Sequence, residues 1–309
     1  MTFRSAALIR RIGMIIPSSS TTMETEIPEL LLRQSLKTGD RFTFHSARLR
    51  MRQVTLEAQS AMNELAIGAV GPLCDADVDA LIYACLLSTP LGTASPRSVE
   101  ARLVDATRRI TAGGIRPLPA VISSAGALAA ALQLLGAERI ALGAPCRKEF
   151  TDEIAAALAG HGFKVVQTHS RDLVDNVDIG RLGTEELLGI VRELDLADAE
   201  APVLSACTQM PSLDILDDVE QALGMPVIRA ATASVHLLLE RLGIERRIEG
   251  VGWLMRRPSC LTASTPRQRR RTRLRQGRLI SPKTSAAMAS TCCGVIFAKM
   301  PCQALELVL

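Results

Sequence analysis

Asp79-Ala-Leu-Ile-Tyr-Ala-Cys85 and Ala201-Pro-Val-Leu-Ser-Ala-Cys207 are two apolar runs that end in a cysteine and lie in corresponding halves of the 309-residue chain. Short buried runs that alternate with helical stretches are typical of strands in a parallel sheet. Open α/β sheets bind their ligands beyond the carboxyl ends of such strands. The two runs therefore predict an α/β fold that brings two thiols to one crevice.

Cys85 and Cys207 admit two interpretations. Two thiols on opposite sides of a crevice can attack, or exchange protons with, both faces of a small flat carbon centre, as a cofactor-independent isomerase or racemase requires. Cysteine is also among the most buried residue types, so both thiols could instead be packing residues of the core. Position alone leaves both interpretations open.

Strand-like runs and helical stretches alternate along most of the chain, which predicts mostly parallel sheets flanked by helices. The predicted strands cover residues 12–17, 41–45, 79–85, 118–123, 139–144, 163–168, 201–207 and 226–230. The predicted helices cover residues 53–67, 97–111, 125–135, 213–223 and 232–242, and three of them stop near Gly136, Gly224 and Gly243. Thr151 and Thr184 precede acidic residues and are the predicted N-caps of two further helices.

The chain also shows a weak internal repetition. Ile16-Pro-Ser-Ser19 has a rough counterpart in Val121-Ile-Ser-Ser124, and Tyr83-Ala-Cys85 has one in Ser205-Ala-Cys207. Two related α/β lobes that face each other would show such a pattern. The repetition alone could also be chance, and the expectation of two pseudo-symmetric lobes with the active site between them comes from a family resemblance.

The C-terminal segment differs from the rest of the chain in charge. Residues 250–309 carry nine Arg and two Lys against one acid, Glu306, whereas the whole chain has a net charge of only +4. The segment has no helical or strand period, so we expect a disordered basic tail. Non-specific binding to an anionic polymer is the alternative, which we consider weaker.

The domain prediction follows from this change in character. A two-lobed body covers residues 1–249, and the tail covers residues 250–309. Lobe one covers about residues 10–120, with a return of the chain near 226–245, and lobe two covers about residues 121–225.

Composition argues against several classes of function. Aromatic residues make up 3% of the chain, which argues against a base-stacking nucleic-acid surface, and no nucleotide-binding glycine motif occurs. The four histidines are scattered, and the cysteines near the C-terminus have no paired histidines, so no zinc-site spacing is present. We find no convincing secretory leader and no run long enough to span a membrane, so we expect a cytoplasmic protein with reduced thiols.

Two hydroxyl-rich segments are candidate cradles for a carboxylate. Pro17-Ser-Ser-Ser-Thr-Thr-Met-Glu24 follows the first predicted strand, and Val121-Ile-Ser-Ser-Ala-Gly126 precedes an Ala-rich helix. Hydroxyls and unpaired backbone N–H groups at the start of a helix bind anions readily. Two such cradles facing each other would suit a small dicarboxylate, and ordinary N-cap loops are the alternative.

These motifs resemble the maleate cis-trans isomerases of the aspartate/glutamate racemase superfamily, to which arylmalonate decarboxylase is related. The resemblance covers about residues 10–245 and implies a two-lobed α/β fold, no cofactor or metal, a small dicarboxylate substrate, no specific nucleic-acid or membrane partner, and a homodimer as a further expectation. It rests on the segments 11–28, 41–51, 83–86, 121–128 and 203–213.

The resemblance also implies roles for particular residues. Cys85 is the nucleophile that adds to the double bond of maleate, and Cys207 is the acid/base that handles the proton before fumarate leaves. Such a mechanism is physically reasonable because a thiolate is a strong nucleophile. The implied substrate-binding residues are Ser20, Thr21, Thr22, Cys146, Asn176 and Thr208. For Asn176, a simple Asx turn is the alternative.

The chain departs from the family pattern at two of these positions and in one loop. Ser20 stands where relatives usually have asparagine, Cys146 stands where they have tyrosine, and the segment after Cys85 lacks their Gly-Tyr-His-like lid. These departures bear on the substrate and the rate more than on the fold. The remaining alternatives are a racemase of an acidic amino acid, a decarboxylase of the arylmalonate type, and a catalytically weak member that binds a dicarboxylate or another protein.

Overall fold

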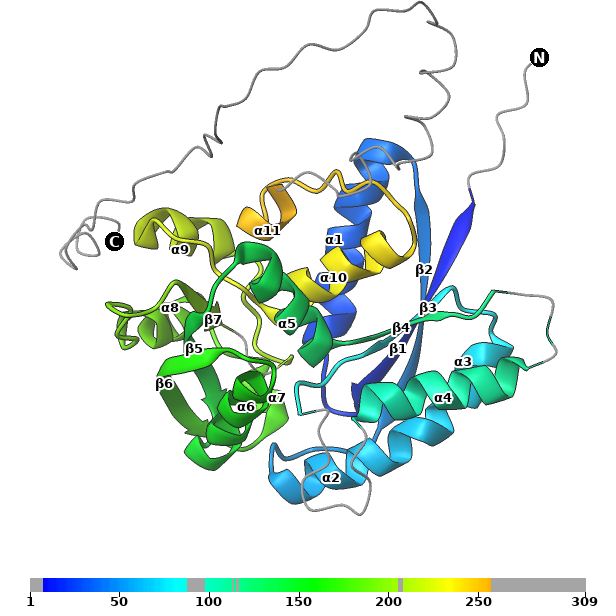
Figure 1. Cartoon of the computed structure of the whole chain (residues 1–309), viewed down its shortest axis with the longest axis horizontal. Helices are drawn as coiled ribbons and strands as arrows, with labels where there is room; N and C mark the ends of the chain where they lie inside the picture. The colour runs from blue at the N-terminus through cyan, green and yellow to red at the C-terminus, as the bar shows by residue number, and fades with distance from the viewer. Residues whose placement is uncertain (1–7, 88–97, 113, 115–116, 205–207, 257–309) are drawn as a thin grey trace, which may run out of the picture. The chain divides into compact units, whose positions relative to one another are not determined.

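The computed structural model describes residues 8–87, 98–112, 114, 117–204 and 208–256, which contain two parallel β-sheets flanked by helices (Figure 1). The α/β prediction is therefore confirmed. None of the described helices is long and apolar enough to cross a membrane.

The first sheet has the strand order β2-β1-β3-β4, and all of its strand pairs are parallel. β1 (Ile9–Pro17) pairs with β2 (Arg41–Leu49) on one side and with β3 (Ala80–Tyr83) on the other, and β4 (Ala120–Ser123) lies beyond β3. β3 is buried along its whole length, as expected of an inner strand covered on both faces, whereas the edge strand β2 is partly exposed.

The second sheet repeats this topology with the order β6-β5-β7. β5 (Arg139–Cys146) lies between β6 (Lys164–Leu173) and β7 (Ala201–Leu204), again with parallel pairs only. Ile228 forms an isolated parallel bridge to Val203 of β7, at the place that β4 takes beside β3. β3 and β7, which precede Cys85 and Cys207 in the sequence, therefore occupy equivalent positions in the two sheets.

The helices cover the sheets and connect their strands. α10 packs against α1, α5 and β4, so the chain returns to the first sheet after the second one is complete. The helices are α1 (Thr22–Thr38), α2 (Leu56–Leu65), α3 (Val70–Asp75), α4 (Val99–Thr111), α5 (Ser124–Leu135), α6 (Lys148–Gly160), α7 (Asn176–Ile179), α8 (Thr184–Arg192), α9 (Leu216–Leu223), α10 (Ala230–Arg241) and α11 (Trp253–Arg256).

Two predicted helix starts are wrong. Thr151 lies inside α6, whose N-cap is Arg147, and its hydroxyl donates back to the carbonyl of Arg147. Thr184 is the first residue of α8, and Gly183 is the N-cap. The predicted stops are better placed, since Gly136 and Gly224 cap α5 and α9 in the left-handed conformation that favours glycine.

The boundary predicted between the lobes also needs correction. Residues 121–123 belong to β4 and pair with β3, so they are part of the first sheet rather than the second lobe. Ile16–Ser19 and Val121–Ser124 therefore resemble each other as ends of two strands in the same sheet. Of the two repeated motifs, only the cysteine segments follow strands that take equivalent positions in the two sheets.

The packed body continues beyond the predicted end at residue 249. Val251, Leu254 and Met255 are buried in the core. Arg256 forms ion pairs with Asp217 and Glu220 of α9, which fastens α11 to the body. Removing the chain after Gly252 would therefore expose core surface. The predicted tail from residue 257 onward lies outside the described residues.

Candidate active site

The carboxyl end of the first sheet contains a topological switch point between β1 and β3. From β1 the chain crosses to β2 on one side, whereas β3 leads to β4 on the other side. The loops that follow β1 and β3 therefore diverge and leave a crevice, which is where α/β proteins of this type bind ligands. Residues 18–21 follow β1, and residues 84–87 follow β3.

A cavity beside these segments is lined by residues of both halves of the body; we call it the inner cavity. Three residues predicted from the sequence, Cys85, Asn176 and Thr208, meet here. Asn176 and Thr208 come from the second half, and Cys85 comes from the first. The other described lining residues, which sequence reasoning missed, are Pro17, Met51, Val54, Gln59, Leu86 and Phe150.

Cys85 lies at the edge of a buried polar cluster. Its side chain is mostly buried, and Sγ lies 2.6 Å from Oε1 of Gln59, to which the thiol donates. Gln59 in turn donates to Oδ1 of Asn63 at 2.7 Å, and the hydroxyl of Tyr83 donates to the same oxygen. Burial, together with the neighbouring Cys85, raises the pKa of Tyr83 well above its ordinary value, so Tyr83 stays protonated as a donor.

The segment that follows Cys207 is held by the first half of the body. The hydroxyl of Thr208 donates to the carbonyl of Ala84 at 3.0 Å, which joins the immediate neighbours of the two predicted cysteines. The backbone N–H groups of Ser212 and Leu213 both donate to Oε1 of Glu26 in α1, at 3.0 Å each. Residues 208–213 are therefore anchored to β3 and α1.

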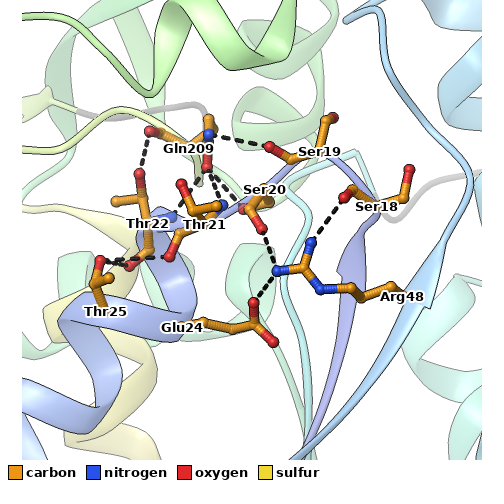
Figure 2. A network of polar contacts seen from close by, with 9 residues as sticks. All are labelled: Ser18, Ser19, Ser20, Thr21, Thr22, Glu24, Thr25, Arg48 and Gln209. Atoms are coloured by element: carbon orange, nitrogen blue, oxygen red, sulfur yellow. Dashed lines mark hydrogen bonds and ion pairs between the residues drawn. The ribbon is translucent and has the colours of Figure 1, made fainter.

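The first predicted cradle exists, but its occupant is Gln209 (Figure 2). Oε1 of Gln209 accepts three hydrogen bonds, from the Ser20 hydroxyl at 2.9 Å and from the N–H groups of Thr21 and Thr22 at 2.8 and 3.1 Å. The Thr22 hydroxyl also donates to the backbone carbonyl of Gln209 at 2.6 Å. The expectation that Ser20, Thr21 and Thr22 contact a substrate carboxylate directly is therefore not supported, because these donors are engaged by an amide oxygen of the chain itself.

Arg48 holds the same loop from the other side. Its guanidinium donates to the carbonyls of Ser18 and Ser20 at 2.7 and 3.2 Å, and it forms an ion pair with Glu24 (Figure 2). These contacts place an acidic residue in the first turn of α1, where the helix dipole favours negative charge.

The second predicted cradle is also filled from within the chain. The backbone N–H of Ser123 donates to Oε2 of Glu100 at 3.2 Å, and its hydroxyl donates to the same oxygen. A Cβ atom at Gly126 would lie 2.6 Å from this carboxylate oxygen, so the glycine leaves room for Glu100. The two cradles therefore do not face a common ligand.

Three predicted site residues remain, namely Asn176, Cys146 and Cys207. Asn176 is buried, and its Nδ2 donates to the Ser19 hydroxyl at 2.9 Å. The N-cap role near α7 belongs to its neighbour Asp175, so Asn176 is not explained by an Asx turn. Cys146 is fully buried at the end of β5 and is absent from the described lining of the inner cavity. Cys207 lies outside the described residues.

A second cavity of about 440 Å³, the outer cavity, adjoins the inner one. Arg50 and Arg52 line it, while Met51 between them lines the inner cavity. Asp175 and Val177 likewise line the outer cavity, on either side of Asn176. Residues 50–52 and 175–177 therefore lie between the two cavities, with their charged side chains on the side of the outer cavity. Its other lining residues are Ser18, Ser19, Asp178 and Arg181.

No metal site accompanies these cavities in the part of the chain that the structure describes. There, no three His, Cys, Asp or Glu side chains gather closely enough to hold a metal ion. The chemistry available to the described inner cavity is that of a thiol, three hydroxyl or amide side chains and an apolar wall.

Known proteins share both the sequence and the fold. The sequence profile of the arylmalonate decarboxylase family matches residues 12–255. A maleate isomerase from Geobacillus stearothermophilus is 42% identical over 247 residues, which cover 79% of this chain and 96% of that protein. One from Nocardia farcinica (strain IFM 10152) is 37% identical over 257 residues, covering 83% of this chain and 99% of that protein.

Solved structures agree with these matches. A variant of the maleate isomerase Iso from Pseudomonas putida S16, crystallised with maleate, aligns with a TM-score of 0.75 at 36% identity, covering 80% of this chain and 98% of that one. A Nocardia farcinica maleate cis-trans isomerase mutant with a covalently bound succinylcysteine intermediate aligns with a TM-score of 0.73 at 36% identity and the same coverage.

Fold and site together define an α/β protein with two parallel sheets of matching topology and a thiol at the switch point of the first. The chain belongs to the arylmalonate decarboxylase family and, within it, to the group that contains the maleate isomerases.

Proposed function

We propose that this protein converts maleate, or a closely similar cis-dicarboxylate, to its trans isomer without a cofactor. Its relatives at 37–42% identity are isomerases, and the reaction class follows from the family. The substrate and the residue roles are our proposal. The observation that carries it is the hydrogen bond between Thr208 and Ala84, since each of these residues is the chain neighbour of one proposed catalytic cysteine.

The Thr208–Ala84 bond supports a shared site for Cys85 and Cys207. Consecutive Cα atoms are about 3.8 Å apart, so anchoring the neighbours limits how far apart the two cysteines can be. The equivalent positions of β3 and β7 in their sheets support the same arrangement, with one thiol supplied by each half.

In the proposed reaction, the Cys85 thiol first transfers its proton to the Cys207 thiolate. The Cys85 sulfur then adds to C2 of maleate, and the electron pair of the double bond takes the proton from Cys207 at C3. The product is a succinyl thioether with a single C2–C3 bond, about which rotation is easy. Return of the C3 proton to Cys207 re-forms the double bond and expels the Cys85 thiolate, which gives fumarate. Transfer of this proton from Cys207 back to Cys85 restores the starting state.

The succinylcysteine intermediate in the Nocardia farcinica relative supports the covalent step. The outer cavity supports a dianionic substrate, because its lining has three arginines against two aspartates. Asn176 is proposed to bind a carboxylate, since it lines the inner cavity and one of its two amide hydrogens is used by Ser19.

The first experiment measures fumarate formed from maleate by the purified protein and by two variants. We expect Cys85→Ala to lower kcat by about 10³-fold or more, because it removes the nucleophile. Cys74→Ala is the matched control, since Cys74 is half-buried in α3 and lines neither cavity. Substantial activity in Cys85→Ala would exclude the covalent mechanism.

A second experiment assigns the two roles. Cys207→Ser is mixed with maleate, quenched and examined by peptide mass spectrometry. We expect a succinyl adduct on Cys85, because the variant lacks the thiol that returns the proton. An adduct on Cys207 in the Cys85→Ser variant, and none on Cys85, would reverse the assignment.

A further inference from the structure

The direction of the hydrogen bonds beneath Cys85 is set by a backbone carbonyl. The carbonyl oxygen of Leu87 can only accept, and Nδ2 of Asn63 donates to it at 3.1 Å. This bond fixes the orientation of the Asn63 amide, so its Oδ1 points toward Gln59. Asn63 therefore offers Gln59 an acceptor.

Gln59 passes this direction on to Cys85. Its Nε2 donates to Oδ1 of Asn63 at 2.7 Å, which leaves Oε1 to face the sulfur. The Tyr83 hydroxyl donates to the same Asn63 oxygen and reinforces the orientation. An amide flip at Gln59 would place two oxygens against each other and would leave Nε2 facing a thiol hydrogen.

Burial makes this orientation hard to reverse. Gln59, Asn63 and Tyr83 are 0%, 3% and 0% exposed, so water does not replace a lost partner. In such surroundings an unpaired polar group costs more than it does at the surface. The relay from Leu87 through Asn63 to Gln59 therefore has one preferred direction.

We propose that Gln59 is a positioning residue that holds the Cys85 thiol hydrogen away from the substrate and keeps the resting thiol protonated. The sulfur lone pairs then face the inner cavity, and the proton leaves only when the acid/base partner takes it. A hydrogen bond donated by the thiol stabilises the protonated form, whereas a thiolate would face a carbonyl oxygen. The inference rests on the nucleophilic role proposed for Cys85.

The direct test is the S–H stretching band of Cys85 in the substrate-free protein. The band is isolated by an infrared difference spectrum against Cys85→Ala. We expect Gln59→Met, which keeps the side-chain length but removes the acceptor, to move the band to higher wavenumber. An unchanged band would overturn the proposal, and this result is independent of whether maleate is the substrate.

Gln34→Met is the matched control, because Gln34 is equally buried, in α1, and among the described residues its side chain bonds to Asp40, Glu245 and Arg247, away from the inner cavity. It should lower stability while leaving the band and the kinetics unchanged. In Gln59→Met we expect kcat to fall roughly five- to ten-fold with KM unchanged. An equal fall in kcat in Gln59→Met and Gln34→Met would mean that Gln59 acts only through packing.

Gln59→Glu provides a second variant of the same shape. Its carboxylate can no longer donate to Oδ1 of Asn63, but it still accepts the thiol hydrogen and opposes a thiolate more strongly than the amide does. The rising limb of the kcat/KM profile should therefore move to higher pH. The pH dependence of the rate at which iodoacetamide alkylates Cys85 should shift to higher pH as well, and this measurement needs no substrate. A limb that stays in place, or moves to lower pH, would contradict the proposed orientation.

Discussion

The loop after β1 and the junction at which β4 passes directly into α5, which we call the β4 loop, have the same design but different occupants. Each follows a strand of the first sheet, presents hydroxyl and N–H donors, and leads into a helix. The β1 loop holds the neutral amide of Gln209, which comes from the second half of the body. The β4 loop holds the carboxylate of Glu100, which comes from α4 of its own half. The β1 loop therefore joins the two halves, whereas the β4 loop binds a residue of its own half.

This difference shows that a loop with well-placed donors does not by itself bind a ligand. A helix start with hydroxyl residues attracts an oxygen acceptor wherever one is available. In both loops a side chain of the protein provides that acceptor, so the motif alone does not indicate a substrate site. Near the inner cavity its use is to anchor the segment after Cys207.

Among the variants that test this difference between the two loops, Gln209→Ala should have the largest effect. It removes the acceptor of three donors and loosens the segment around residue 209, although Glu26 still holds Ser212 and Leu213, so stability should fall by roughly 2–4 kcal/mol. A small displacement of a catalytic group costs about 10²-fold in rate, so we expect kcat to fall by that order. Thermal unfolding and fumarate production measure the two effects.

Gln221→Ala, an exposed glutamine in α9, is the control for the substitution itself and should change neither quantity. Wild-type kcat in a folded Gln209→Ala protein would show that the anchor is not needed for catalysis.

Sequence reasoning was successful where the signal is local. Seven of the eight predicted strands, and the cysteine segments after β3 and β7, follow from apolar runs and their spacing, whereas residues 226–230 form only an isolated bridge at Ile228. Cys85, Asn176 and Thr208, which the family resemblance named, line one cavity, and their roles in substrate binding remain predictions. The second cysteine, Cys207, remains a prediction.

What the sequence did not reveal depends on distant partners. Gln209 lies 189 residues from Ser20, and no local pattern links an amide to a loop at that separation. Gln59 and Phe150 line the inner cavity from helices without any recognisable motif. The only available signal for Gln209 was its position two residues after Cys207.

A smaller effect is expected at the β4 loop from Glu100→Gln. The amide keeps one acceptor oxygen for Ser123 but loses the charge that strengthens the bonds, at a cost of about 1 kcal/mol. Because this loop does not reach the inner cavity, kcat/KM for maleate should be unchanged. A loss of activity comparable to that of Gln209→Ala would mean that both loops support the site and that the comparison fails.

An effect that appears only at acidic pH concerns α10, which covers α5 directly after the β4 loop. The hydroxyls of Ser124 and Ser234 lie 3.3 Å apart, and two residues further along α10 His236 accepts a hydrogen bond from Arg246. Burial and the nearby Arg246 lower the pKa of His236 to about 4. The unfolded chain takes up this proton near its ordinary pKa of 6.5, so it binds more protons than the native state between about pH 6.5 and 4.

Stability should therefore fall as the pH drops through that window, and the effect should be absent above it. Because His236 is partly exposed, solvent screening reduces its contribution to about 1–2 kcal/mol. In His236→Gln, which keeps an acceptor for Arg246, the melting temperature should decline less between pH 7.5 and pH 5 than in the wild type. The exposed His161→Gln should follow the wild type. If His236→Gln also does so, acid sensitivity arises elsewhere, and the helix packed behind the β4 loop contributes no titrating group.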